Sequence, residues 1–417
     1  MTEKVLARRL TTPDAVVIGL GSMIGAGVFV ALAPAAEAAG SGLLVGLVLA
    51  GVVAWCNATS SAQLAAQYPT SGGSYFYGRQ RLGEWPGFVA GWGFVVGKTA
   101  SCAAMATTFA TYAVPTDRWA QRLVAAAAVV GLTAVNVRGI TRTARLTRLL
   151  VTVTLVVLAG WTIAVLASGR PGTDGLRLHD LSAYGVLQSA GLLFFAFAGY
   201  ARIATLGEEV VEPERTIPRA VVVALIGAFA VYAVVAVVAL AAVGPEAVAA
   251  TPTPLAHVAG AVGQGWASPV VRVGAAVASL GSLLALLAGV GRTGLAMARE
   301  GDLPHGLSRV DPRHQVPDLV QYLLAAAVVG LVLTVDLRGV IGFSSFGVLL
   351  YYAVANAAAY TQDPEHRRWQ KPVQLLGLVG CLGLVATLPW TSVVAGFTVF
   401  AVGVAGRAVA MRARGSR

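Results

Sequence analysis

Long apolar stretches, separated by short polar segments, run along this chain almost from end to end. Each stretch holds about 20 predominantly apolar residues, which is the length an α-helix needs to cross the hydrocarbon core of a bilayer. The pattern predicts twelve transmembrane helices, over residues 14–36, 42–66, 86–114, 119–136, 146–168, 183–207, 218–243, 268–297, 318–336, 338–360, 373–389 and 391–410. We therefore expect an all-α polytopic membrane protein that forms one transmembrane domain over residues 1–417.

The composition agrees with a bilayer as the solvent for most of the chain. Hydrophobic residues make up 57% of the sequence and charged residues only 12%, against roughly 25% charged residues in an ordinary soluble domain. The net charge of +11 is spread over short segments between apolar runs, as in membrane proteins, so we expect no nucleic-acid partner. The expected partners are the lipid bilayer and a small solute.

The distribution of basic residues predicts the orientation of the chain. If the N-terminus lies inside, the inner segments and helix ends carry 22 of the 30 Lys and Arg residues, and the outer ones carry 6. This asymmetry predicts that both termini lie in the cytoplasm. The membrane that we expect the protein to span is the plasma membrane. Lys4, Arg8 and Arg9 before the first apolar run imitate a secretory signal. Because eleven further apolar segments follow, we interpret that run as an uncleaved first helix.

Small residues interrupt two of the apolar segments. The first interruption is Gly19-Leu20-Gly21-Ser22-Met23-Ile24-Gly25-Ala26-Gly27-Val28-Phe29, and the second is Phe194-Phe195-Ala196-Phe197-Ala198-Gly199-Tyr200. Backbone groups released from a helix inside lipid cost several kcal/mol each unless a partner binds them. Two such breaks in corresponding positions of two halves indicate the substrate site of a transporter.

The first interruption has two alternative explanations. A dinucleotide-binding fingerprint would need a preceding strand and an acidic residue about 20 positions later, whereas the flanks here are apolar helix. A packing face between Gly21 and Gly25 is the structural alternative. In the functional interpretation, amide N–H groups exposed by the small residues bind a carboxylate.

The two breaks lie about 174 residues apart along the chain. This distance suggests a repeat of five plus five helices, with one unit near 14–168 and the other near 183–360. Two additional helices over about 373–410 would follow the repeat.

Four groups of sequence motifs occur in order over about 300 residues. The first two are Asp14-Ala15-Val16-Val17-Ile18-Gly19 with Ile24-Gly25-Ala26-Gly27-Val28-Phe29, and Pro69-Thr70-Ser71-Gly72-Gly73-Ser74-Tyr75-Phe76-Tyr77 with Gly83-Glu84 and Gly91-Trp92. The others are the second interruption with Glu208-Glu209 and Pro213-Glu214-Arg215-Thr216-Ile217-Pro218-Arg219-Ala220, and Arg292 with Met297-Ala298-Arg299-Glu300-Gly301-Asp302-Leu303-Pro304. Together they resemble the amino acid–polyamine–organocation transporter family. The resemblance implies a LeuT-type fold with an inverted repeat, and transport of an amino acid or amine.

The resemblance also implies which residues bind the substrate. The carboxylate end would be lined by Met23, Ile24, Gly25, Ala26 and Gly27. Carbonyl groups of Phe195, Ala196 and Ala198 would bind the amine, and Phe195 would serve as an aromatic lid. Ordinary helix packing is the alternative for the phenylalanines of this segment.

Coupling to an ion has two candidate locations. Several family members carry a lysine in the fifth helix, where the alignment places Thr154 in this chain. Lys98 near the centre of the third predicted helix is a possible replacement as a proton carrier, because an ammonium in hydrocarbon costs at least about 2.5–3.5 kcal/mol and is usually functional. In the structural alternative, Lys98 reaches carbonyls at a helix break or donates to Thr and Ser neighbours. The competing ion is sodium, held by first-helix carbonyls with Thr154 and Ser279 or Ser282.

The charge pattern favours a neutral substrate. Arg202 follows the second break and always stays charged; it would extend toward the inner surface, pair with Glu208 or Glu209, or repel cationic substrates. No carboxylate lies deep in a predicted helix, and a cationic amino acid or polyamine site would be expected to use one. A cationic amino acid or amine exchanger remains the alternative substrate class, because aromatic rings and carbonyls also hold cations.

Other kinds of chemistry find little support. The cysteines (Cys56, Cys102 and Cys381) lie within apolar runs, and the histidines (His179, His257, His305, His314 and His366) lie in loops without metal-ligand spacing. We expect no cofactor, no metal cluster and no enzyme activity, because no nucleophile–base pair is visible. A channel would need a continuous polar pore and a sensor would need a soluble output domain. The prediction is a secondary transporter that works by alternating access, with its direction, exchange mode and oligomeric state left open.

Overall fold

The computed structural model describes residues 10–415 except 71, 115–116, 140–143 and 179–180. The first ten helices are α1 (Thr12–Met23), α2 (Gly27–Val30), α3 (Leu32–Ala39), α4 (Leu43–Gln67), α5 (Gly73–Leu82), α6 (Glu84–Ala113), α7 (Arg118–Val137), α8 (Ala144–Ala167), α9 (Ala183–Phe197) and α10 (Ala201–Ala204). The others are α11 (Pro213–Ala249), α12 (Pro254–Ala261), α13 (Ala267–Arg299), α14 (Asp318–Thr334), α15 (Leu337–Tyr360), α16 (Lys371–Thr387) and α17 (Trp390–Gly415). Short 3₁₀ turns are η1 (Gly40–Gly42), η2 (Asp174–Leu176), η3 (Ala198–Tyr200), η4 (His305–Ser308) and η5 (Pro364–His366).

The described part of the chain is all helical, and its only β-type pairing is an isolated bridge between Leu10 and Val210. Among the described residues, ten helical segments are long and apolar enough to cross a membrane. The remaining two predicted spans correspond to α14 and α16, which are apolar but have 17 residues each. The protein is therefore an all-α polytopic membrane protein, and the number of twelve crossings stays a prediction.

Local sequence explains where many of these helices begin. The carboxylate of Asp117 accepts hydrogen bonds from the amides of Trp119 and Ala120 at the start of α7, and Asp336 caps α15 in the same way. Such caps satisfy amide groups that have no partner within the helix. Pro213 and Pro254 stand in the first turns of α11 and α12, where their lack of an N–H has no cost.

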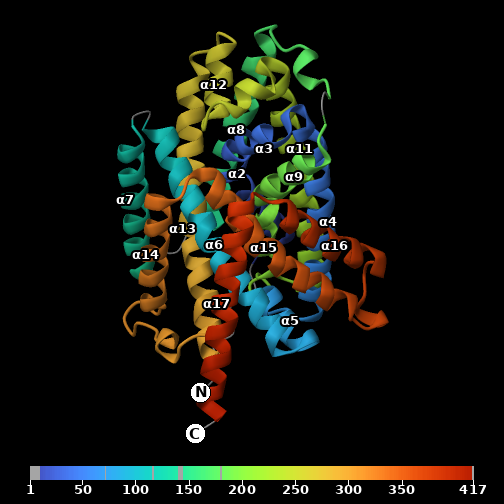
Figure 1. Ribbon diagram of the computed structural model, residues 1–417, viewed down its shortest axis with the longest axis vertical. Coiled ribbons are helices and arrows are strands. Elements are labelled where there is room, and N and C mark those ends of the chain that lie inside the picture. The colour runs from blue at the N-terminus through green and yellow to red at the C-terminus, as the bar shows by residue number, and fades with distance from the viewer. Residues whose placement is uncertain (1–9, 71, 115–116, 140–143, 179–180, 416–417) are drawn as a thin grey trace.

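Two predicted loops contain helices that hydropathy did not reveal. The polar segment between the second and third predicted spans includes α5, and the predicted outer loop over 244–267 includes the end of α11 and all of α12. Both helices are too short to cross a bilayer, and they lie at opposite ends of the molecule (Figure 1). The α12 helix is stabilised by burial of Leu255 and Val258, which a search for membrane-length runs does not detect.

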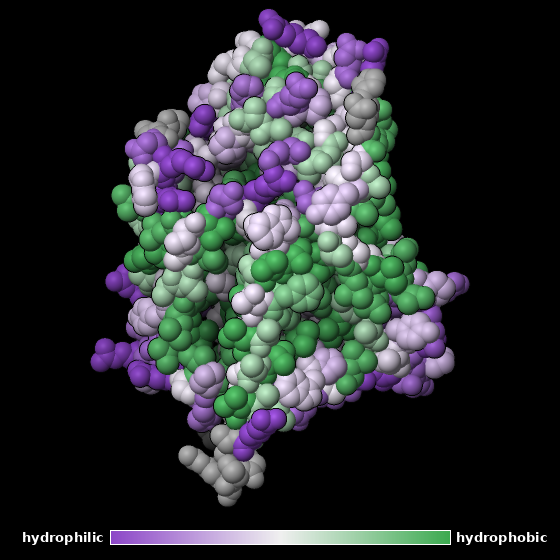
Figure 2. Space-filling model, in the orientation of Figure 1, coloured by the Kyte–Doolittle hydropathy of each residue, from purple (hydrophilic) through white to green (hydrophobic). Residues whose placement is uncertain are grey.

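The helices pack around a centre formed by the interrupted segments. α6 packs along α13 and α15, while α4 packs against α9 and α11. α1 contacts α8, α11 and η3, so both interruptions lie inside the bundle. Figure 2 shows hydrophobic residues gathered around the middle of the molecule and hydrophilic residues toward its ends, as expected for a surface that faces lipid.

Candidate functional site

The first interruption separates α1 from α2. α1 ends at Met23, residues 24–26 are not helical, and α2 begins at Gly27. All five residues that the sequence assigned to the carboxylate end, Met23 to Gly27, are buried inside the bundle. The break therefore exposes backbone groups in a place where only the protein or a bound solute can satisfy them.

The second interruption lies between α9 and α10. α9 ends at Phe197, and η3 tightens the chain over Ala198–Tyr200 before α10 starts. A Cβ atom added to Gly199 would lie 2.2 Å from the carbonyl oxygen of Ser22, and Gly27 packs against Ala196. The two breaks are thus in direct contact, although they are far apart in sequence.

Carbonyl groups of the second break accept hydrogen bonds from side chains of other helices. The Tyr232 hydroxyl on α11 donates to the Ala196 oxygen at 2.9 Å. The Ala198 oxygen accepts from the Lys98 ammonium at 3.0 Å and from the Tyr352 hydroxyl at 3.3 Å. A substrate amine that binds these carbonyls must join or displace donors that belong to the protein.

Lys98 lies on α6 with only 6% of its surface exposed. No carboxylate within 4.0 Å of it is found among the residues that the structure describes. The neighbouring hydroxyls are engaged elsewhere, because Thr99 donates to the Val95 oxygen and Ser101 lies 2.6 Å from the Ser344 hydroxyl. The protein therefore holds this ammonium group by a hydrogen bond to the helix break, and not by bonds to its Thr and Ser neighbours.

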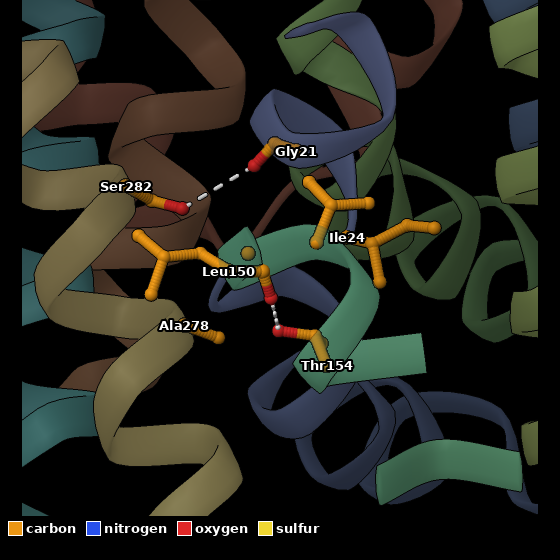
Figure 3. Close-up of a pocket in the computed structure, with 8 residues that line it drawn as sticks. Gly21, Ile24, Leu150, Thr154, Ala278 and Ser282 are labelled. Carbon is orange, nitrogen blue, oxygen red and sulfur yellow. Dashed lines mark hydrogen bonds between the residues drawn. The ribbon is translucent and has the colours of Figure 1, made fainter. Parts of the chain in front are cut away.

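A small cavity adjoins the first break (Figure 3). Its volume is about 10 Å³, which is about enough for one water molecule or small ion. Eight residues line it: Gly21, Ile24, Gly25, Leu150, Val151, Thr154, Ala278 and Ser282. Three helices, α1, α8 and α13, thus bring Thr154 and Ser282 together beside the break.

The oxygen atoms at this cavity are of the kind that hard cations prefer. The Ser282 hydroxyl lies 3.5 Å from the Gly21 oxygen, and the Thr154 hydroxyl donates to the Leu150 oxygen at 2.8 Å (Figure 3). Ser279 does not line the cavity, although it is fully buried and its hydroxyl has no hydrogen-bond partner among the described residues. Of the two serines considered for sodium, Ser282 is therefore the one placed at the cavity.

The aromatic residues of the second break have different surroundings. Phe194 packs edge-on against Tyr352, and Phe197 packs edge-on against Tyr232. Phe195 instead belongs to an apolar cluster that includes Ala26 of the first break. Ordinary packing thus accounts for Phe194 and Phe197, whereas the role of Phe195 as an aromatic lid stays a prediction.

Arg202 lies on α10, just beyond the second break. It is partly buried and donates to the Thr205 hydroxyl at 3.3 Å. The ion pairs within 4.0 Å among the described residues do not include it. Pairing of Arg202 with Glu208 or Glu209, one of the expected arrangements, stays a prediction.

Sequence reasoning did not single out the tyrosines that donate to the breaks. Tyr232 and Tyr352 bind the second break, and Tyr112 donates to the Phe29 oxygen beyond the first one at 2.8 Å. A usable signal was present, because all three lie inside predicted membrane helices. A tyrosine hydroxyl at such a depth needs a hydrogen-bond partner.

Side chains of the kind that ligate transition metals do not cluster in the described part of the chain. No group of three or more His, Cys, Asp or Glu side chains there could hold a metal ion. The site consists of backbone groups, hydroxyls and one ammonium group. Such groups bind and release a solute or an ion.

Comparisons with known proteins agree with this chemistry. A family model described as amino acid permease matches residues 10–406. An uncharacterized transporter of Mycobacterium tuberculosis is 57% identical over 98% of this chain and 93% of its own length. The branched-chain amino acid permease BcaP of Bacillus subtilis is 25% identical over 94% of this chain and 90% of its own length.

A cationic amino acid transporter (number 4, vacuolar) of Arabidopsis thaliana is 28% identical over 83% of this chain and 62% of its own length. These relatives are named as transporters rather than enzymes, and the resemblance to the amino acid–polyamine–organocation family is confirmed. The chain belongs to the amino acid permease family.

Proposed function

We propose that this protein is a secondary active transporter that moves neutral amino acids across a plasma membrane by alternating access, with both termini in the cytoplasm. The observation that carries the proposal is the direct contact between the two helix breaks, at Gly199 and Ser22. It brings the backbone amide groups of one break next to the carbonyl groups of the other. An α-amino acid presents complementary charges, a carboxylate and an ammonium, a few ångströms apart.

In this proposal the two ends of the substrate bind different breaks. The carboxylate accepts hydrogen bonds from amides of the first break, at Gly25, Ala26 and Gly27, since the amide of Ile24 already donates to the Leu20 oxygen. The ammonium binds carbonyls of Phe195, Ala196 and Ala198 and shares them with Tyr232 and Lys98. Rocking of α1 and the α9–α10 segment against the other helices then exposes the site alternately to the two sides.

A neutral substrate is favoured by the charges around the breaks. Lys98 lies at the second break itself and Arg202 just beyond it. Over Thr12–Val30 and Ala183–Ala204 the only acidic residue is Asp14 at the start of α1, and Arg148 pairs with it. The names of the relatives do not decide the matter, since one refers to branched-chain and another to cationic amino acids. Cationic amino acids or amines therefore remain the alternative substrate class.

Two coupling ions fit the geometry. Lys98 would carry a proton and release the Ala198 carbonyl when it loses its charge. Sodium would instead occupy the cavity between Gly21, Thr154 and Ser282. Both versions place the ion next to one of the breaks, so that ion binding and substrate binding affect the same backbone.

The proposal is tested with the full-length protein in two steps. Purified protein is first screened by thermal unfolding against amino acids, amines and polyamines, because a ligand that binds the folded form raises its stability by mass action. Compounds that stabilise it are then followed as radiolabelled solutes into proteoliposomes with an imposed pH or sodium gradient. Uphill accumulation of a neutral amino acid supports the proposal, and stabilisation by none of these compounds, or only by cationic amino acids and polyamines, contradicts it.

A further inference from the structure

A groove of about 600 Å³ lies between α6, α13, α14 and α15, and its lining contains none of the residues assigned to the two breaks. The α14 helix contributes a stripe of side chains from Val320 to Thr334, at spacings of one, three and four residues along one face. Opposite the stripe lie Trp92 and Thr99 of α6 and Gly294 of α13. Thr99 directly follows Lys98, so the groove borders the helix that carries the buried ammonium.

The groove offers no free polar group to a solute. Its lining residues with polar side-chain atoms are Trp92, Thr99 and Thr334. The Trp92 indole donates to the Val399 oxygen at 3.1 Å, and the two threonines each donate to a carbonyl of their own helix at 2.6 Å. Because every one of these donors already has a backbone acceptor, the groove suits an occupant that is apolar throughout.

The dimensions of the groove further limit the kinds of molecule that can occupy it. At 1.5 Å per residue, the stripe from Val320 to Thr334 extends about 21 Å along the axis of α14. A transmembrane partner helix of that length and about 10 Å diameter has a volume on the order of 1,600 Å³, which exceeds the roughly 1,310 Å³ of empty space in the groove, its open side included. A single hydrocarbon chain is narrow enough, and the length exceeds the roughly 15 Å depth of one leaflet's hydrocarbon.

We propose that this groove binds one acyl chain of a bilayer phospholipid and retains it between α14 and the α6–α13–α15 layer. Leu323 on α14 is exposed at the groove, so a chain can enter sideways from the surrounding lipid. The groove is wide enough for the chain because three of its lining residues have small side chains or none: Gly294, Ala327 and Gly330. Contact with four helices distinguishes this chain from boundary lipid that touches a single helix face.

The test fills the groove without disturbing the helices around it. A Cβ atom at Gly330 meets no other atom within 4 Å, so Gly330→Leu places a side chain in the groove without a clash. Gly131 on α7 is exposed, is also free of neighbours within 4 Å and lies outside the groove, which makes Gly131→Leu the matched control. Native mass spectrometry of the full-length proteins, after a detergent wash of dioleoylphosphatidylcholine proteoliposomes, counts the phospholipids that remain bound.

We expect the wild type and Gly131→Leu to keep one phospholipid that Gly330→Leu loses. A second measurement uses chain-brominated phosphatidylcholine, which quenches tryptophan fluorescence at contact. Trp92→Phe should lower the quenchable emission in the wild-type background and leave it unchanged in the Gly330→Leu background. Equal lipid retention by the wild type and Gly330→Leu, or retention of no lipid by the wild type, would overturn the proposal.

Discussion

Gly199 lies so close to Ser22 that a Cβ atom at position 199 would stand 2.2 Å from the Ser22 carbonyl oxygen. Backbone meets backbone at this point, without a side chain between the two interrupted segments. The contact explains why small residues occur where an uninterrupted membrane helix would carry larger apolar ones. It also means that a movement of one break must displace the other.

Replacing Gly25 with leucine should abolish uptake while leaving membrane insertion intact. A Cβ atom at this position would lie 2.0 Å from the Ser282 hydroxyl oxygen, and a leucine would fill both the amide end of the site and the small cavity. Uptake by proteoliposomes and the thermal stabilisation by substrate are measured for Gly25→Leu. The matched control is Gly131→Leu, whose added side chain meets no neighbour. Wild-type uptake by Gly25→Leu would show that the first break is not the carboxylate site.

If Lys98 carries the coupling proton, Lys98→Met should lose pH-driven accumulation and retain exchange of substrate across the membrane. Methionine is similar in length and uncharged, so packing is largely kept while the donor to the Ala198 oxygen is removed. Net uptake under an imposed pH gradient and counterflow of labelled substrate are compared in the same proteoliposomes. Thr99→Val serves as a control, because the Thr99 hydroxyl bonds only within its own helix. Wild-type uptake that requires sodium and ignores the pH gradient would contradict a role for Lys98 in coupling.

The positions of the breaks could be predicted from the sequence, whereas the donors that bind them could not. Glycine and alanine clusters within apolar runs show locally where a helix loses its hydrogen bonds. The pairing of Tyr232 with Ala196, and of Lys98 with Ala198, depends on how separate helices are placed against each other. No local pattern encodes that arrangement.

The choice between Ser279 and Ser282 illustrates the same limit. The two serines are three residues apart on α13, so their side chains lie on the same side of the helix, nearly one turn apart along its axis. The placement of α13 against α1 and α8 decides which of them reaches the cavity. Burial of α5 and α12 against the bundle is likewise a tertiary effect, which is why hydropathy assigned both segments to loops.

If sodium is the coupling ion, Ser282→Ala and Thr154→Val should each raise the sodium concentration that gives half-maximal uptake. Each variant removes one hydroxyl oxygen from the lining of the cavity, and a hard cation depends on such oxygens. Ser279→Ala is the control, because Ser279 is buried on the same helix but does not line the cavity. An equal shift in all three variants would indicate a general loss of packing rather than an ion site.

The buried ion pair between Arg407 and Asp302 should contribute strongly to stability. Arg407 on α17 donates to the Asp302 carboxylate at 2.7 Å, and both side chains are 2% exposed. Arg79 and Tyr75 of α5 bind the other oxygen of the same carboxylate. Removing one partner of a buried pair typically costs about 3–5 kcal/mol, and because Arg79 and Tyr75 still bind Asp302 we expect a loss at the lower end of that range for Arg407→Met. Arg407→Met should therefore lower the unfolding temperature of the protein clearly.

The control for that experiment lies on the same helix. Arg412 is exposed near the end of α17, so Arg412→Met changes the charge by the same amount without opening a buried pair. It should shift the unfolding temperature little. If Arg412→Met destabilises as much as Arg407→Met, net charge rather than the ion pair determines the effect.

Neutral amino acids should compete for the site better than lysine, arginine or putrescine. Lys98 and Arg202 give the interior two cations near the second break, and the acid in the interrupted helices, Asp14, is already paired with Arg148. At an effective dielectric constant near 20, two like charges about 8 Å apart repel by roughly 2 kcal/mol. That repulsion corresponds to more than a tenfold loss of affinity for a substrate with a second ammonium group.

The measurement is inhibition of labelled neutral amino acid uptake by each unlabelled competitor. A preference for the dibasic compounds would contradict the prediction and would require rings to hold the extra charge by cation–π contact. Phe195, Phe197 and Tyr200 are the rings nearest in sequence, but Phe197 packs on Tyr232, and Tyr200 stacks on Tyr352. Because Phe195 belongs to a different apolar cluster, these rings do not form a single cage in this structure, and the neutral substrate remains the expected one.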